Sequence, residues 1–284
     1  MERQKRIAAI HDISGFGKCA LTVALPVISA AGIEVSVIPT AILSTHTGGL
    51  QGYTHLDLTD EMPKIANHWE SLNLTFDAVY SGYLGSERQI DIVSKFIETF
   101  KTDKNLAIVD PAMADNGRMY ALLDMEFAKS MKRLCQKADI IVPNMTEAAF
   151  LLDREYFHGP YKKDYIEATV RELSKFGPQK VVLTGVCFDD NNIGAASYDA
   201  KTDTVSYYFR NRVEGMFHGT GDVFASALTA ALLRGKTLQK ATEIAVDFTV
   251  DSIERTAMGG TDHRYGVDFE RGLGDLIKVL DKKD

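Results

Sequence analysis

The sequence predicts an α/β protein with a mostly parallel, doubly wound sheet and an antiparallel hairpin at one edge. Short, nearly all-apolar runs alternate with longer helical runs along most of the chain, as expected for strands that are covered on both faces. Two further strand-like runs follow one another with only a polar turn between them. The 284 residues show no low-complexity linker and no internal repeat. This length is compatible with one α/β domain or with two small ones, and we expect a single domain spanning residues 1–284.

Six short apolar runs are expected to form the main strands of this sheet. They are RIAAI (6–10), EVSVI (34–38), AVYS (78–81), LAIVD (106–110), IIVP (140–143) and VVLT (181–184). The edge hairpin is expected from residues 193–199 and 205–210. In doubly wound sheets ligands bind at the carboxyl ends of the strands, so the residues that follow each strand are the first candidates for a site.

Helices are expected between the strands, and two of them carry start signals. Residues 59–72 open with Thr59 and two acids, and residues 86–100 open with Ser86 and Glu87. A small hydroxyl residue followed by acids is typical of a helix N-terminus, where side-chain oxygens accept free amides and the helix dipole favours negative charge.

Composition and charge exclude several classes of protein. The formal net charge is −7, so no general electrostatic field attracts nucleic acid or anionic lipid. The first apolar run is too short for a signal peptide, and no run reaches the roughly 18 residues that a membrane span needs. Cys19, Cys135 and Cys187 are odd in number and fit no metal-ligand spacing. We expect a cytoplasmic protein in a reducing compartment.

The stretch HDISGFGKCA (11–20) contains the pattern G-x-G-x-x-A directly after a strand, as in dinucleotide-binding loops. Such a loop also needs an acid at the carboxyl end of the second strand. Glu34 has the right spacing but precedes that strand, which at about 3.3 Å per residue places it roughly 15 Å from the required end. Residues 39–41 supply no acid. The nicotinamide dehydrogenase hypothesis is therefore set aside.

The polar residues of this loop indicate a different ligand. Asp12 and Ser14 follow the first strand, and residues 45–47 (THT) follow the second. Neighbouring polar loops at one sheet edge form the floor of a pocket. The alternative is that Asp12 or Ser14 caps the next helix.

A second glycine loop lies in GMFHGTGDVFASALTAALLRG (215–235), where a mostly helical last third of the chain begins. Gly219, Thr220 and Gly221 precede a helix whose buried stripe is expected from Val223, Phe224, Ala227, Leu228, Ala231 and Leu232. Glycines ahead of a helix let a phosphate approach the free amides and the positive dipole end. We therefore expect these residues to bind a phosphoryl group in transfer.

Asp222 lies in the first turn of that helix. A carboxylate beside an anion site can accept the proton of an attacking hydroxyl during phosphoryl transfer. The alternative is an ordinary aspartate at a helix start, which is common.

The motifs together resemble the ribokinase-like superfamily, and within it the pyridoxal and pyridoxamine kinases. The resemblance rests on HDISGFGKCALTVALPVISAAG (11–32), LSTHTGG (43–49), SGYLGS (81–86), DPAMADNGRMY (110–120), VPNMTEAAFLL (142–152) and GTGD (219–222). It spans nearly the whole chain and implies a three-layer α/β/α sandwich. It further implies ATP-dependent phosphorylation of the 5-hydroxymethyl group of pyridoxal, pyridoxamine or pyridoxine, in a homodimer with no nucleic-acid or membrane partner.

The resemblance also implies roles for individual residues. Asp222 is the expected base, with Gly219, Thr220 and Gly221 as the anion hole. The expected nucleotide-binding residues are Asp110, Asp115, Asn144, Glu147, Thr184, Gly185, Met258 and Gly260, of which Asp110 and Glu147 face magnesium. Few carboxylates, retained waters and substrate phosphates are what magnesium prefers. A capping box of Asn144 and Glu147 at a helix start is an alternative that is compatible with this role.

The expected vitamin-binding residues are Asp12, Ser14, His46, Thr47 and Tyr83. Tyr83 has packing as its alternative role. Asp12 departs from the serine of many pyridoxal kinases and resembles hydroxymethylpyrimidine kinases. That activity is the nearest alternative, and a non-catalytic vitamin-binding module is a more distant one. A requirement for a monovalent cation is left open.

Overall fold

The computed structural model describes residues 3–121 and 123–282. The chain forms two compact units: unit 1 contains Met1–Ala78 and Val213–Asp284, and unit 2 contains Val79–Arg212. The single domain expected for residues 1–284 stays a prediction.

Unit 1 combines a small mixed sheet with helices from both ends of the chain. Its elements are β1 (Arg6–Ser14), α1 (Leu21–Ala30), β2 (Glu34–Leu43), β3 (His55–Asp57), α2 (Met62–Ser71), α7 (Thr220–Leu233), α8 (Leu238–Gly259), the 3-10 helices η1 (His263–Tyr265) and η2 (Glu270–Gly272), and α9 (Leu273–Asp281). β1 is parallel to β2, with a register shift between His11 and Ile13, and β3 is antiparallel to β2. This shift occurs where β1 reaches the first glycine loop.

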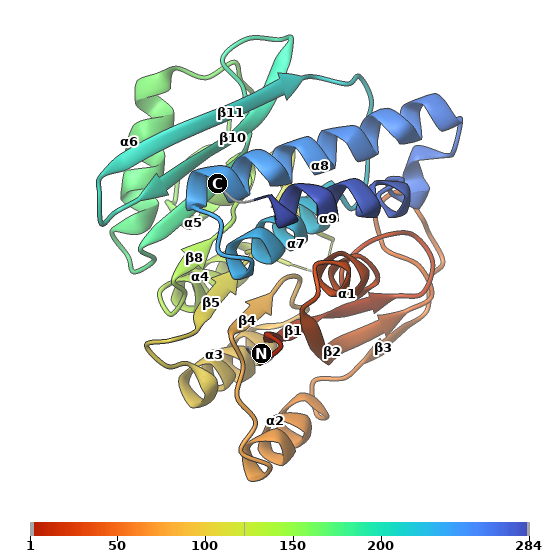
Figure 1. The fold of residues 1–284 in the computed structure, drawn as a ribbon, viewed down its shortest axis with the longest axis vertical. Coiled ribbons are helices and arrows are strands. Elements are labelled where there is room, and N and C mark those ends of the chain that lie inside the picture. Colours follow the sequence, from red (N-terminus) through yellow and green to blue (C-terminus); the bar gives the residue numbers. More distant parts are fainter. Residues whose placement is uncertain (1–2, 122, 283–284) are drawn as a thin grey trace. The chain divides into compact units, whose positions relative to one another are not determined.

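Helix α7 is buried around most of its circumference. Every residue of 223–231 is buried, whereas Leu232 is partly exposed. The reason is that α7 packs against α1 on one side and α8 on another, and its small side chains permit both approaches (Figure 1). The predicted single stripe was therefore too narrow, and the prediction that Leu232 is buried was wrong.

Unit 2 contains the longer run of strand–helix alternation. Its elements are β4 (Ala78–Ser81), which begins at the unit boundary, α3 (Glu87–Phe100), β5 (Leu106–Val109), β6 (Ala114–Asp115), β7 (Arg118–Met119), α4 (Met125–Cys135), β8 (Ile140–Ile141), α5 (Met145–Leu151), α6 (Lys163–Ser174), β9 (Lys180–Val186), β10 (Asn192–Asp199) and β11 (Thr204–Asn211). The strand order is β11-β10-β9-β8-β5-β4. β5, β8 and β9 run parallel, and β10 is antiparallel to both β9 and β11.

The predicted α/β class is confirmed, and so are the six strands and the edge hairpin, which Figure 1 shows as the teal pair β10 and β11. The Ser86 hydroxyl caps α3 by accepting the Gln89 N–H, as expected. Helix α2 begins at Met62, three residues after Thr59, because a turn occupies its predicted start. The Glu61 N–H donates to the Leu58 carbonyl in this turn, and the Thr59 N–H donates to Asp57 Oδ1.

Two findings concern the predicted class of protein. None of the helices formed by residues 3–121 and 123–282 is long and apolar enough to cross a bilayer. Cys19, Cys135 and Cys187 are all free thiols, of which Cys135 and Cys187 are buried.

Candidate active site

The two glycine loops, which are about 200 residues apart in the sequence, pack against each other in unit 1. The first is closed at its base by an isolated bridge between Ile13 and Ala20. Gly219 has φ 75°, and a Cβ at this position would overlap the carbonyl oxygen of Lys18. Glycine is therefore required both by the backbone conformation and by the contact. The residues predicted to hold a substrate and those predicted to hold a phosphoryl group thus share one corner of unit 1.

Asp222 is held at this corner by the start of α1. The Ala20 N–H donates a hydrogen bond to its carboxylate. Ala20 is the N-cap of α1 and adopts φ 54° and ψ −129°, a conformation that L residues rarely adopt. The half-buried Asp222 therefore supplies the polar partner for the entry into α1 and keeps its position from the backbone of a second helix.

Asp12 is buried at the end of β1 and lies close to Asp222. The Ser14 hydroxyl donates to Asp12 Oδ2 over 3.1 Å. Helix α1 has no side-chain cap, so capping of α1 by Asp12 or Ser14, the alternative considered above, is wrong. Both predicted ligand-contacting side chains instead point toward each other at the carboxyl end of the strand.

Burial sets the protonation of this carboxylate pair. Burial raises the pKa of Asp12 to about 6, and the hydrogen bond from the Ser14 hydroxyl offsets part of this rise. Burial raises the pKa of Asp222 to about 7, the Ala20 N–H lowers it, and the Asp12 charge raises it again. Burial and both carboxylates also raise the pKa of the Cys19 thiol. The sequence did not lead us to expect Cys19 beside this pair. An acid with a pKa near neutrality can exchange a proton during a reaction at neutral pH.

The first turn of α7 offers free backbone amides beside Asp222. The Val223 N–H makes a helical hydrogen bond to the Gly219 carbonyl, so the amides of residues 220–222 precede the helical ladder. No side chain caps α7, and a Cβ built at Gly221 would meet no atom within 4 Å. Amides in this position, with the helix dipole behind them, can bind an anion.

His46 is buried beside the same loops, with both ring nitrogens engaged by the backbone. Nδ1 accepts the Gly48 N–H at 3.1 Å, and Nε2 lies 2.6 Å from the Arg264 carbonyl oxygen. The neighbouring Thr47 is exposed. His218, which sequence reasoning missed although it directly precedes the glycine loop, lies with its ring centre 5.3 Å from that of His46.

In unit 2, Asp110 and Glu147 form a second pair of buried acids. Asp110 directly follows β5, and Glu147 is in the first turn of α5. Glu147 accepts the Met113 N–H at 3.1 Å and the Asn144 N–H at 2.8 Å, and Asn144 completes the predicted capping box. Burial and the nearby Asp110 charge raise the pKa of Glu147. Glu147 therefore completes the capping box and at the same time lies close to Asp110.

This pair fits a hydrated magnesium ion better than a closed metal cage. Among residues 3–121 and 123–282 no three His, Cys, Asp or Glu side chains cluster to hold a metal. Two buried carboxylates that repel one another would be stabilised by a divalent cation, and magnesium keeps several waters. Asp115, also predicted here, is exposed, and its carboxylate accepts hydrogen bonds from Asn116.

The remaining predicted residues divide between the units. In unit 2, Tyr83 follows β4, and its ring centre lies 6.3 Å from that of Tyr120. The Thr184 hydroxyl donates to the Pro143 carbonyl at 3.5 Å, and the neighbouring Gly185 is exposed. In unit 1, Met258 at the end of α8 is 87% exposed, and Gly260 is the C-cap of that helix.

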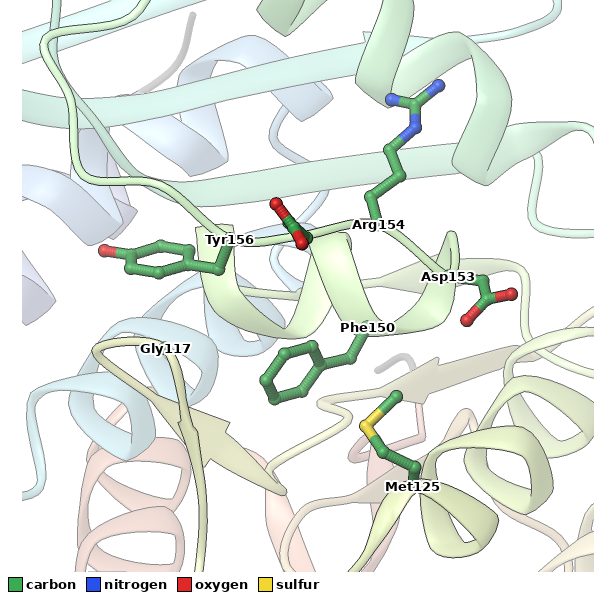
Figure 2. Close-up of a pocket in the computed structure, with 7 residues that line it drawn as sticks. Gly117, Met125, Phe150, Asp153, Arg154 and Tyr156 are labelled. Atoms are coloured by element: carbon green, nitrogen blue, oxygen red, sulfur yellow. The ribbon is translucent and has the colours of Figure 1, made fainter.

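Unit 2 also contains an open cavity of about 470 Å³ (Figure 2). It is lined by Gly117, Met125, Phe150, Asp153, Arg154, Glu155 and Tyr156. No residue of the predicted site lines it. The Gly117 N–H, however, donates to the Thr146 hydroxyl, next to Glu147.

The sequence is similar to one protein family and to individual members whose names describe kinases. Residues 24–266 match the family model described as phosphomethylpyrimidine kinase. A pyridoxine/pyridoxal/pyridoxamine kinase of Bordetella avium is 28% identical over 267 residues, which cover 89% of this chain and 86% of that protein.

Two solved structures are similar over almost the whole chain. A Bacteroides thetaiotaomicron protein, assigned by its description to the phosphomethylpyrimidine kinases and crystallised with pyridoxal, is 40% identical with a TM-score of 0.93, covering 96% of each chain. Pyridoxal kinase from Lactobacillus plantarum is 31% identical with a TM-score of 0.89, covering 98% of each chain.

The contact between the glycine loops predicts a contrast between two neighbouring alanine substitutions. Gly219→Ala should lower the free energy of unfolding by at least about 1–2 kcal/mol, because a left-handed conformation costs an L residue that much before the overlap with Lys18 is counted. Gly221→Ala should leave stability unchanged or raise it by up to about 1 kcal/mol, because its Cβ meets open space in a helix. Urea unfolding at 25 °C measures both, and equal losses would contradict the packing described.

Proposed function

Because the chain belongs to the phosphomethylpyrimidine kinase family, whose fold is ribokinase-like, we propose that it transfers the γ-phosphoryl group of ATP to the 5-hydroxymethyl group of a B6 vitamer. Pyridoxal, pyridoxamine and pyridoxine are the proposed acceptors. The Bacteroides structure with pyridoxal and the named kinases of the comparison support this substrate class. The observation that carries the proposal is Asp222, placed at the amide end of α7 with a pKa near neutrality.

The chemistry assigned to unit 1 is proton transfer and charge stabilisation. The vitamin's hydroxyl oxygen forms a bond to the γ-phosphorus while the bond from that phosphorus to the β–γ bridging oxygen breaks. ADP leaves, and the hydroxyl proton passes to Asp222. The amides of residues 220–222 would bind the oxygens of the transferred group, and one such donor is typically worth about 2.7–4 kcal/mol of barrier.

The acceptor ring is assigned to polar groups at the carboxyl ends of strands. Asp12, supported by the Ser14 hydroxyl, would accept a hydrogen bond from a protonated ring nitrogen or an amino group. Thr47 is exposed in the loop after β2, and Tyr83 is partly exposed after β4. His46, the remaining residue predicted for this site, has both ring nitrogens engaged by the backbone.

The nucleotide and magnesium are assigned to the remaining predicted residues. Asp110 and Glu147 would hold magnesium through water, and the ion, when bound, would neutralise phosphate charge. Nucleotide contacts are proposed for Asp110, Asp115, Asn144, Glu147, Thr184, Gly185, Met258 and Gly260. A homodimer in the cytoplasm is part of the same proposal.

The family description also favours a second candidate acceptor, hydroxymethylpyrimidine. Incubating the protein with magnesium-ATP and each alcohol separately should give phosphorylated B6 vitamers, detected by mass spectrometry. Phosphorylation of hydroxymethylpyrimidine alone would assign the chain to thiamine synthesis. No product with any alcohol would favour a non-catalytic vitamin-binding module.

Replacing the proposed base separates chemistry from folding. Asp222→Asn should lower kcat by orders of magnitude, because an amide cannot accept the proton, whereas its Oδ1 can still accept the Ala20 N–H. The exposed Asp275→Asn is the matched control and should retain full activity. Near-normal turnover of Asp222→Asn would discard the base assignment.

The raised pKa values predict opposite effects of pH on activity and stability. Activity should rise with pH through about 7 as Asp222 ionises, and Asp12→Asn should shift this rise to lower pH because the Asp12 charge raises the pKa of Asp222.

Folding stability should fall over the pH range in which activity rises. A carboxyl whose pKa is higher in the folded than in the unfolded chain stabilises the fold below pH 4, and this contribution is lost as pH rises to about 7. Asp222→Asn should therefore gain stability relative to wild type between pH 4 and 8. Thermal unfolding across this range measures the gain, and a constant difference would contradict the pKa assignment.

A further inference from the structure

The hydrogen bonds of His46 fix its tautomer. Because Nδ1 accepts the Gly48 N–H, it carries a lone pair, so the ring proton is on Nε2 and is donated to the Arg264 carbonyl. The His46 backbone N–H also donates to the Phe16 carbonyl at 3.2 Å. One residue thus ties together three segments that are far apart in the sequence.

Close packing reinforces these bonds. A Cβ at Gly17, which has φ 83°, would overlap the His46 ring, and a Cβ at Gly48 would lie 2.5 Å from His218 Nδ1. The two imidazole rings lie 5.3 Å apart with an interplanar angle of 35°. Neither ring can shift far without displacing a loop.

These contacts extend to the proposed phosphoryl-binding amides. His218 directly precedes Gly219, whose missing Cβ makes room for the Lys18 carbonyl, and the Lys18 N–H donates to the Tyr265 carbonyl at 3.2 Å. Four segments, residues 15–20, 44–49, 217–221 and 262–266, therefore interlock; we refer to them as the four-loop cluster. His46 is at its centre and is only 5% exposed.

We propose that His46 is a positioning residue that acts through the four-loop cluster on Asp222 and the α7 amides, and that its ring nitrogens do not bind the vitamin. Its two nitrogens have no remaining donor or acceptor to offer while the backbone bonds persist. Misplacement of a reacting group by about 1 Å can cost about 100-fold in rate. The catalytic part of this inference rests on the proposed function.

Two amide substitutions, each of which can replace one of the two ring nitrogens, test the hydrogen bond from His46 Nε2 to the Arg264 carbonyl. His46→Ala should lower kcat about 10- to 100-fold while the KM for the vitamin changes less than about threefold. His46→Gln, whose amide can reach the Arg264 carbonyl, should recover most of kcat, whereas His46→Asn, which can replace only the local bond to Gly48, should not. The exposed His68→Ala is the matched control and should behave as wild type.

Direct substrate binding gives a different pattern. A rise in the vitamin KM of tenfold or more for His46→Ala, with kcat preserved, would overturn the proposal, as would equal rescue by asparagine and glutamine. Thermal unfolding of each variant at the assay pH identifies losses that come from unfolding, and kcat is compared only at temperatures where all variants are folded.

The ring geometry is testable without any activity. Long-range ¹H–¹⁵N spectra of the wild-type protein at pH 7.5, with the His46 signals assigned by their loss in His46→Gln, should show the Nε2-protonated tautomer. A proton on Nδ1 would overturn the proposal. If the wild-type protein phosphorylates none of the alcohols, the proposed function fails, and the catalytic role of His46 fails with it, whereas the tautomer result still decides whether the ring ties the loops together.

Discussion

The contact between Gly219 and the carbonyl of Lys18 determines the rest of the candidate site in unit 1. It brings the start of α7 against the loop after β1. Asp222 can therefore accept the Ala20 N–H, and it lies close enough to Asp12 for that charge to raise its pKa. A larger residue at position 219 would separate these elements. The raised pKa of Asp222, the free amides of α7 and the strained backbone of Ala20 all depend on this approach of one backbone to another.

The same arrangement carries an energetic cost that a purely structural role does not explain. Two carboxyls with raised pKa values are less stable as ions in the folded chain than in water, so their ionisation at neutral pH opposes folding. Ala20 adds a backbone conformation that costs an L residue on the order of 1–3 kcal/mol. Strain and buried charge at one place, at the carboxyl end of a strand, are typical of a site that binds and reacts.

Elements that depend on local sequence could be predicted, and contacts between distant segments could not. The buried strands were evident because their side chains are apolar on both faces, and the Asn144–Glu147 capping box because its two residues are three apart. The short β6–β7 hairpin was not predicted, since two-residue strands leave no periodic pattern. The burial of α7 on several sides was missed because it depends on α1, which lies about 200 residues earlier.

The first glycine loop shows why such a pattern should be interpreted with care. A glycine pattern after a strand indicates that something approaches the backbone closely, but it does not identify what approaches. In dinucleotide-binding loops the approaching group is a pyrophosphate. Here the space beside Gly17 is filled by the His46 ring, and the space beside Gly219 by the Lys18 carbonyl, both from the protein itself. The glycines of the first loop therefore make room for other parts of the protein, and its polar residues Asp12 and Ser14 are the ones proposed to contact a ligand.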